Sequence, residues 1–164
     1  MTSTSAPAIE AAFAYCDTMV REHYENFPVA SLLLPRNKRS YVAAIYAFAR
    51  TADDFADEGN AAPQERLERL DVWGRKLAGA AAGRAGDHVF IALAETMART
   101  GLPAALLEDL LTAFRMDVTT RRYATYADLL QYCRYSANPV GRIVLHLFDE
   151  AKPQNLVYSD SICT

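Results

Sequence analysis

The chain has 164 residues, of which 51% are hydrophobic and 23% charged, and this size and composition predict one soluble globular domain spanning residues 1–164. Its formal net charge is −3 and its Lys and Arg residues are scattered, which excludes an extended nucleic-acid surface. Three cysteines without Cys-x-x-Cys spacing, no bilayer-length apolar run and no leader-like start predict a cytoplasmic protein, at most peripheral to a membrane.

Apolar residues recur every three or four positions along almost the whole chain, which is the period of amphipathic helices. We therefore predict an all-α fold. Residues 1–7 are small or polar and are expected to be disordered. A first helix is predicted over 8–24, before the helix-breaking Pro28. A second is predicted over 37–58, beginning at a capping Asn37.

Five further helices follow from start and stop signals in the sequence. They are predicted over 63–82, from the cap Asp87 past Met97, from Pro103 through Phe114, from the cap Thr125 past Tyr132, and from Pro139 to Phe148. The last residues, 159–164, resemble a helix start without a stop signal, so we expect the sequence to be incomplete.

One stripe of the second helix carries Tyr46, Arg50, Asp53 and Asp57, at spacings of four, three and four residues. With Asp54 and Glu58, four carboxylates lie in the last two turns, where the helix dipole disfavours each anion by about 0.3–1 kcal/mol. Arg50 can neutralise only part of this charge. A divalent cation could neutralise more.

Mg²⁺ prefers oxygen ligands and is commonly held by one or two carboxylates together with substrate phosphates. Asp53 and Asp57, one helical turn apart, supply such a pair of carboxylates. The residues alone leave two interpretations open: a Mg²⁺ site for a diphosphate substrate, and an ordinary acidic helix end.

Three segments together resemble the squalene/phytoene synthase family. Residues 46–58 resemble its first aspartate-rich motif, residues 32–39 its Leu-Pro-basic lead-in, and residues 132–142 its tyrosine-cysteine to valine-glycine signature. The resemblance runs in order over most of the chain. It implies the N-terminal part of an isoprenoid-synthase-type helical bundle, acting on a prenyl diphosphate with Mg²⁺.

Segments 23–31 and 134–139 are most similar to the bacterial hopanoid-pathway branch, the hydroxysqualene synthases. Tyr24 and Glu25 depart from the hydroxyl and basic residues that follow the histidine in condensing members. This branch implies conversion of presqualene diphosphate into hydroxysqualene with release of diphosphate. Squalene- or phytoene-type condensation remains the alternative, and a non-catalytic helical interaction module is an alternative of another class.

Within this resemblance, Asp53 and Asp57 would bind Mg²⁺, while Arg50 and Tyr46 would contact the diphosphate. A plain ion pair within the helix would also explain Arg50. A half-buried aromatic side chain would also explain Tyr46.

The resemblance also implies roles for Tyr132 and Asp117, and the chemistry of the residues themselves suggests roles for Asn138 and Gly141. Tyr132 would line the reaction cavity as a catalytic residue, and Asn138 would position the capturing water. Asp117 and Gly141 would border the substrate. The alternative for Tyr132 is core packing, and the alternative for Asn138 is a place at a helix entry. An ion pair with Arg121 would also explain Asp117. Gly141 suggests a close approach of two helices.

Family members carry a second aspartate-rich motif on a later helix, and neither 149–150 nor Asp160 has its spacing. We therefore expect an incomplete prenyl-synthase domain that lacks turnover at this length. An incomplete core would leave apolar helix faces exposed and favour a homo-oligomer.

Overall fold

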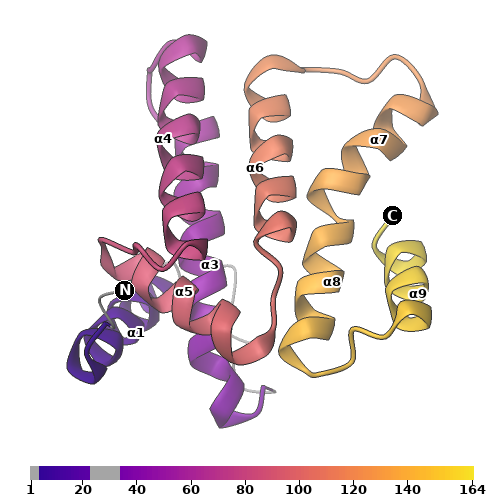
Figure 1. Cartoon of the computed structure of the whole chain (residues 1–164). Coiled ribbons are helices and arrows are strands. Elements are labelled where there is room, and N and C mark those ends of the chain that lie inside the picture. Colours follow the sequence, from indigo (N-terminus) through magenta and orange to yellow (C-terminus); the bar gives the residue numbers. More distant parts are fainter. Residues whose placement is uncertain (1–3, 23–33) are drawn as a thin grey trace.

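The computed structural model describes residues 4–22 and 34–164, and its regular structure is helical throughout these ranges (Figure 1). This confirms the predicted all-α class. The helices are α1 (Ala6–Glu22), α3 (Arg36–Asp57), α4 (Pro63–Ala81), α5 (His88–Thr100), α6 (Ala104–Thr119), α7 (Tyr126–Ser136), α8 (Asn138–Leu147) and α9 (Pro153–Cys163).

Local capping explains the helix starts that the sequence predicted well. The Asp87 side chain accepts a hydrogen bond from the Phe90 amide at 3.2 Å and caps α5. Thr125 and Asp128 form a reciprocal capping box at the start of α7. Such caps involve residues only three positions apart, so they are visible in the sequence.

Several predicted boundaries were wrong. Helix α1 begins at Ala6, so Ala6 and Pro7, which we expected to be disordered, are helical; a proline fits the first turn because its missing N–H has no helical partner there. The predicted end of this helix lies outside the described residues. Helix α3 begins at Arg36 after Pro35, whose carbonyl accepts from the Lys38 amide at 2.9 Å, and Asn37 is not its cap.

Two later helices are longer than predicted. Helix α6 continues past Phe114 to Thr119, which places Asp117 on the helix. Helix α9 begins at Pro153 rather than Ser159, because a proline is well suited to a first helical turn.

Helix α3 is the central element and packs against α1, α4, α5, α6 and α8. Its buried face consists of small residues and Phe48. The rings of Trp73 and Phe90 lie 4.5 Å apart and both border Phe48. The Trp73 indole also donates a hydrogen bond to the Phe48 carbonyl at 3.2 Å. This aromatic cluster fixes α4 and α5 against α3 and so fixes the orientation of the acidic stripe.

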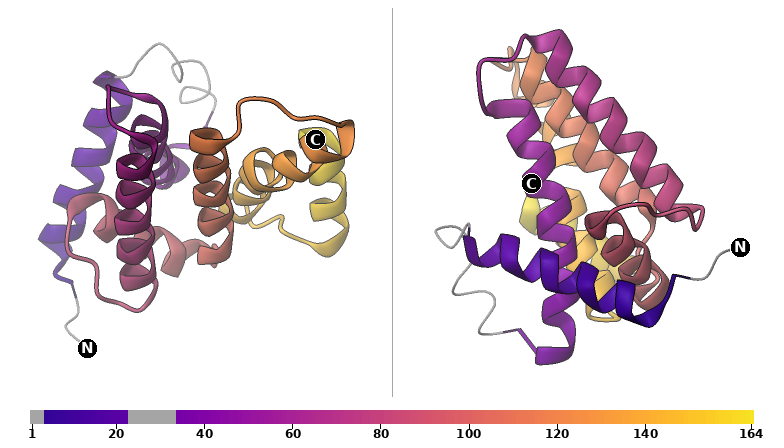
Figure 2. Two further views of the ribbon diagram at one scale, coloured as in Figure 1. Left: turned by 90° about the horizontal axis from the view of Figure 1, so that it is seen from above. Right: turned by 90° about the vertical axis from the view of Figure 1, so that its left-hand side faces the viewer.

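Helices α7, α8 and α9 lie on the opposite side of α6 from α1 and α4, so the first and last helices are far apart (Figures 1 and 2). Helix α9 packs mainly against α8. Lys38, in the first turn of α3, pairs with Asp149, just after α8, at 3.1 Å, although 111 positions separate them. No helix in the described part of the chain is long and apolar enough to cross a membrane.

Candidate functional site

The acidic stripe occupies the C-terminal end of α3, as the sequence predicted. The last turn of the helix holds no basic residue, and Glu58 follows it in an extended conformation. Asp57 and Glu58 are exposed, whereas Asp53 and Asp54 are half-buried. The helix therefore ends in carboxylates that its own last turn does not neutralise.

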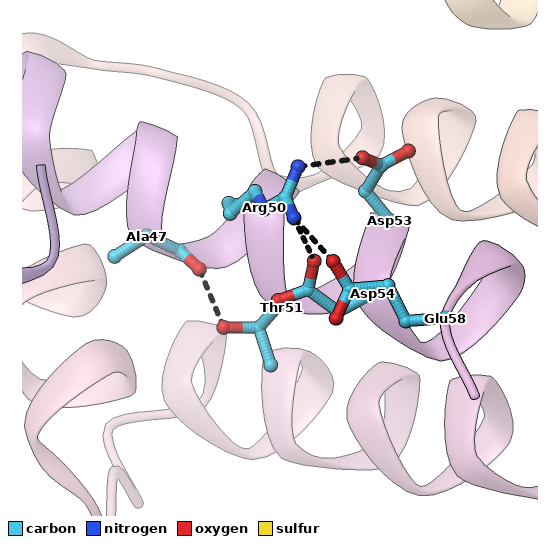
Figure 3. A network of polar contacts seen from close by, with 6 residues as sticks. All are labelled: Ala47, Arg50, Thr51, Asp53, Asp54 and Glu58. Carbon is cyan, nitrogen blue, oxygen red and sulfur yellow. Dashed lines mark hydrogen bonds and ion pairs between the residues drawn. The ribbon is translucent and has the colours of Figure 1, made fainter. Parts of the chain in front are cut away.

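Arg50 lies at the centre of a network of carboxylates (Figure 3). Its terminal nitrogens lie 2.7 Å from Asp54, 2.6 Å from Glu58 and 3.5 Å from Asp53. The ion pair within the helix that we considered for Arg50 is thus present. No ion pair to Asp57 occurs among the described residues, so Arg50 leaves one carboxylate of the predicted metal pair without a cation.

The carboxyl of Asp53 has a raised pKa. Burial is the largest cause, and the charge of Asp57 adds to it, while Arg50 acts in the opposite direction. Asp54 and Asp117 raise this pKa further. The charge of Asp57 also raises the pKa of Asp117, so carboxylates of α3 and α6 influence one another.

Asp117 and Tyr132 are directly joined. The Tyr132 hydroxyl donates a hydrogen bond to Asp117 Oδ2 at 3.1 Å. Burial and this bond raise the pKa of Tyr132 to about 12, and burial also raises the pKa of Asp117. The Tyr132 ring lies 5.2 Å from the ring of Tyr123. Among the described ion pairs none joins Asp117 to Arg121, so the alternative explanation for Asp117 is not realised.

Tyr46 continues the stripe away from the carboxylates and lines an apolar pocket of about 200 Å³ between α3, α6 and α8. The walls of this pocket are entirely apolar in their exposed atoms, and the lining residues are Val42, Ile45, Tyr46, Ala49, Leu110, Val140, Ile143, Val144 and Leu147. Its α8 wall was not predicted from the sequence, although Val140, Ile143, Val144 and Leu147 recur there at helical spacing.

Asn138 lies at the start of α8 and contacts the end of α9. Its side chain is 8% exposed, and its Oδ1 accepts a hydrogen bond from Thr164 at 2.7 Å. It borders a different, polar pocket of about 450 Å³, which also contains Arg134 and Arg142. The role proposed for Asn138 in positioning water stays a prediction.

Gly141 marks a close approach of two helices, as its sequence context suggested. A Cβ atom on Gly141 would collide with Ser159 Oγ and would lie 2.6 Å from Cys163 Sγ. Nearby, Arg142 forms a double hydrogen bond with Asp160. Helix α9 is thus seated on α8 through a glycine and an ion pair, and Asp160 has a structural partner.

Asp53 and Asp57 fit the kind of Mg²⁺ site predicted for them. Their oxygens are hard ligands at helical i,i+4 spacing, and both side chains reach water. The described residues contain no group of three or more His, Cys, Asp or Glu side chains arranged to hold a metal ion. Binding of Mg²⁺ at Asp53 and Asp57 stays a prediction.

Comparison with known proteins places this geometry in a family. Residues 20–164 match the model of squalene/phytoene synthases. The chain is 43% identical over 151 residues to a hydroxysqualene synthase from Sinorhizobium fredii, covering 92% of this chain and 48% of that protein. It is 41% identical over 139 residues to a hydroxysqualene synthase from Rhodopseudomonas palustris, covering 85% of this chain and 46% of that protein.

A solved structure is similar as well. The crystal structure of a squalene synthase from Alicyclobacillus acidocaldarius superposes with a TM-score of 0.89 at 38% identity, covering 97% of this chain and 59% of that one. The chain spans about half the length of the curated relatives it matches. These matches confirm the predicted isoprenoid-synthase-type helical fold, and the chain belongs to the squalene/phytoene synthase family.

Proposed function

We propose that this chain forms one wall of the active site of a Mg²⁺-dependent isoprenoid synthase that converts presqualene diphosphate into hydroxysqualene and releases diphosphate. Its similarity to hydroxysqualene synthases supports this reaction over the condensation reactions of the wider family. Tyr24 and Glu25, which favoured the same choice in the sequence, lie outside the described residues.

The observation that carries the proposal is the order of side chains along α3. Val42, Tyr46 and Ala49 line the apolar pocket, and Asp53 follows Ala49 by four residues. At a rise of about 1.5 Å per residue, roughly 6 Å separates the end of the pocket from the first carboxylate. A molecule with an apolar chain and an anionic head matches this order, provided that a cation joins the head to the carboxylates.

Asp53 and Asp57 would hold Mg²⁺, which when bound supplies positive charge to a departing diphosphate. In the proposed reaction the carbon–oxygen bond to diphosphate breaks and its electron pair leaves with the diphosphate. The cyclopropylcarbinyl cation rearranges, a water oxygen bonds to carbon, and that water loses a proton. The chain's apolar pocket would limit access of water to the cation until capture.

Tyr132 is suited to a position beside this cation. Its ring lies tilted against that of Tyr123, and its hydroxyl donates a hydrogen bond to Asp117. With a pKa near 12, Tyr132 stays neutral at physiological pH, so it offers an aromatic face and a hydroxyl rather than a second anion. The Asp117 carboxylate would keep that hydroxyl in one orientation.

The test is binding of farnesyl thiodiphosphate, a non-hydrolysable analogue, measured by calorimetry with and without Mg²⁺. We expect Mg²⁺-dependent binding that is lost in Asp53→Asn and in Asp57→Asn. Glu65→Gln, which removes one carboxylate from α4, is the matched control and should bind normally. Binding indifferent to Mg²⁺ or to both substitutions would instead favour a helical interaction module.

The choice of substrate is tested separately. Presqualene diphosphate should displace the analogue from the chain more effectively than farnesyl diphosphate does. Because this chain is expected to lack turnover, the products formed from each substrate by a full-length version with Mg²⁺ should be identified by mass spectrometry. Turnover of farnesyl diphosphate alone would contradict the assignment and favour a condensing enzyme.

A further inference from the structure

Arg66 lies in the first turns of α4 but bonds to the end of α3. Its Nε donates to the carbonyl of Ala61 at 3.1 Å, one terminal nitrogen donates to the carbonyl of Gly59 at 2.8 Å, and the other donates to the carbonyl of Ala56. One guanidinium therefore holds three backbone carbonyls. They lie in the last turn of α3 and in the connection to α4.

These bonds meet a need that the sequence of α3 creates. The last carbonyls of a helix have no partner within the helix, and a cation nearby is favourable. Ala56 is buried, and the last turn of α3 contains no basic residue. Arg66 supplies that missing cation from the next helix, beside the carboxylates that the helix dipole disfavours.

The bonds also bracket Asp57. Its neighbour on one side is Ala56, and two residues beyond it is Gly59, where the chain turns with a φ of +76°. A backbone held on both sides of Asp57 cannot readily fray. The position of the Asp57 carboxylate relative to Asp53 therefore depends on Arg66.

We propose that Arg66 is a positioning residue of the acidic site, which fixes the last turn of α3 so that Asp53 and Asp57 present their carboxylates together. This inference rests on the proposed function for its consequence on metal binding. The bonds that Arg66 makes do not depend on that function. Arg69, three positions further along α4, offers a contrast because, within residues 4–22 and 34–164, it pairs only with Glu65, at 2.6 Å on the exposed face.

The first measurement is amide hydrogen exchange in Arg66→Gln, with Arg69→Gln as the matched control. The Glu58 amide, bonded to the Asp54 carbonyl at 3.0 Å, reports on the last turn of α3. We expect its exchange to accelerate at least about tenfold in Arg66→Gln, as expected for local opening. The Phe90 amide in α5 should stay unchanged, and Arg69→Gln should resemble the wild type at both positions.

The second measurement is binding of Mn²⁺ with inorganic diphosphate, followed by electron paramagnetic resonance. Residues that orient metal ligands typically affect affinity by about 10–100-fold, and we expect a loss in this range for Arg66→Gln. Arg66→Lys keeps the charge but cannot hold three carbonyls with a planar fork, so it should recover only part of the affinity. It also serves as the second variant if Arg66→Gln does not fold.

The two measurements separate the inference from the proposed function. If the wild-type chain does not bind Mn²⁺ and diphosphate, the proposed function fails, and exchange at Glu58 alone then decides the role of Arg66. Unchanged exchange at Glu58 overturns the inference. The inference is also overturned if either Arg66→Gln or Arg66→Lys binds Mn²⁺ with wild-type affinity. Positioning by the guanidinium would then have no effect on metal binding.

Discussion

Replacing Asp57 by Asn should stabilise the protein when no divalent cation is present. Asp57 lies at the last residue of α3, has no ion pair among the described residues, and raises the pKa of Asp53 by its charge. Removing an exposed anion from a helix C-terminus contributes about 0.3–1 kcal/mol. Relief of the i,i+4 repulsion with Asp53 adds about 0.2–0.5 kcal/mol.

The sum, about 0.5–1.5 kcal/mol, corresponds to a rise in Tm of about 1–6 °C for a chain of this size. Mg²⁺ and inorganic diphosphate should reverse the order of the two proteins. At a hundred times the dissociation constant, a ligand stabilises the folded state by about 2.7 kcal/mol, which exceeds the advantage of the variant, and Asp57→Asn should lose most of this gain.

Differential scanning calorimetry in chelator, and then in Mg²⁺ with inorganic diphosphate, measures both effects. Glu65→Gln is the control, because it changes the net charge equally but removes an acid from the first turn of α4, where the dipole favours it. Its Tm should fall slightly in both buffers. A lower Tm for Asp57→Asn in chelator would refute the reasoning that the Asp57 carboxylate destabilises this helix end.

Two further predictions concern the later helices. Gly141→Ala should destabilise the protein by about 1–3 kcal/mol, despite the better helix propensity of alanine, because the new Cβ would collide with Ser159 and Cys163. Proteolysis or hydrogen exchange should show that α9 loosens first. Unchanged exchange in α9 would contradict this packing. Asp117→Asn should lower the pKa of Tyr132 from about 12 toward the ordinary value of 10.0, measured by ultraviolet titration of tyrosinate. The pKa of Tyr132 is higher in the folded than in the unfolded state, so its protonated form favours folding. Its contribution to the free energy of unfolding should be complete below pH 10 and lost between about pH 10 and 12. Asp117→Asn should reduce this loss.

Features set by nearby residues could be predicted from the sequence. The caps Asp87 and Thr125 and the stripe from Tyr46 to Asp57 each depend on spacings within one helix. The start of α9 was missed even though Pro153 is a local signal, because Ser159 offered a competing one. The family resemblance added what spacing alone left open, since an acidic helix end by itself has two explanations.

Features set by the docking of distant helices could not be predicted in the same way. Asp117 and Tyr132 were both singled out, but their hydrogen bond depends on how α7 returns along α6. Asn138 was predicted to position the capturing water, whereas its side chain accepts a hydrogen bond from Thr164. The three hydrogen bonds of Arg66 were not predicted, because the sequence around an arginine does not indicate which backbone carbonyls it will bond to.

The apolar pocket has one wall on α3 and another on α8, and the Lys38–Asp149 pair closes the same long loop. Closing so long a loop costs more chain entropy than docking neighbouring helices such as α3 and α4. During synthesis from the N-terminus, Val42 and Ile45 leave the ribosome long before Val144 does. The apolar side chains of the α3 wall therefore remain exposed to water, or bound by a chaperone, until about a hundred further residues have been made.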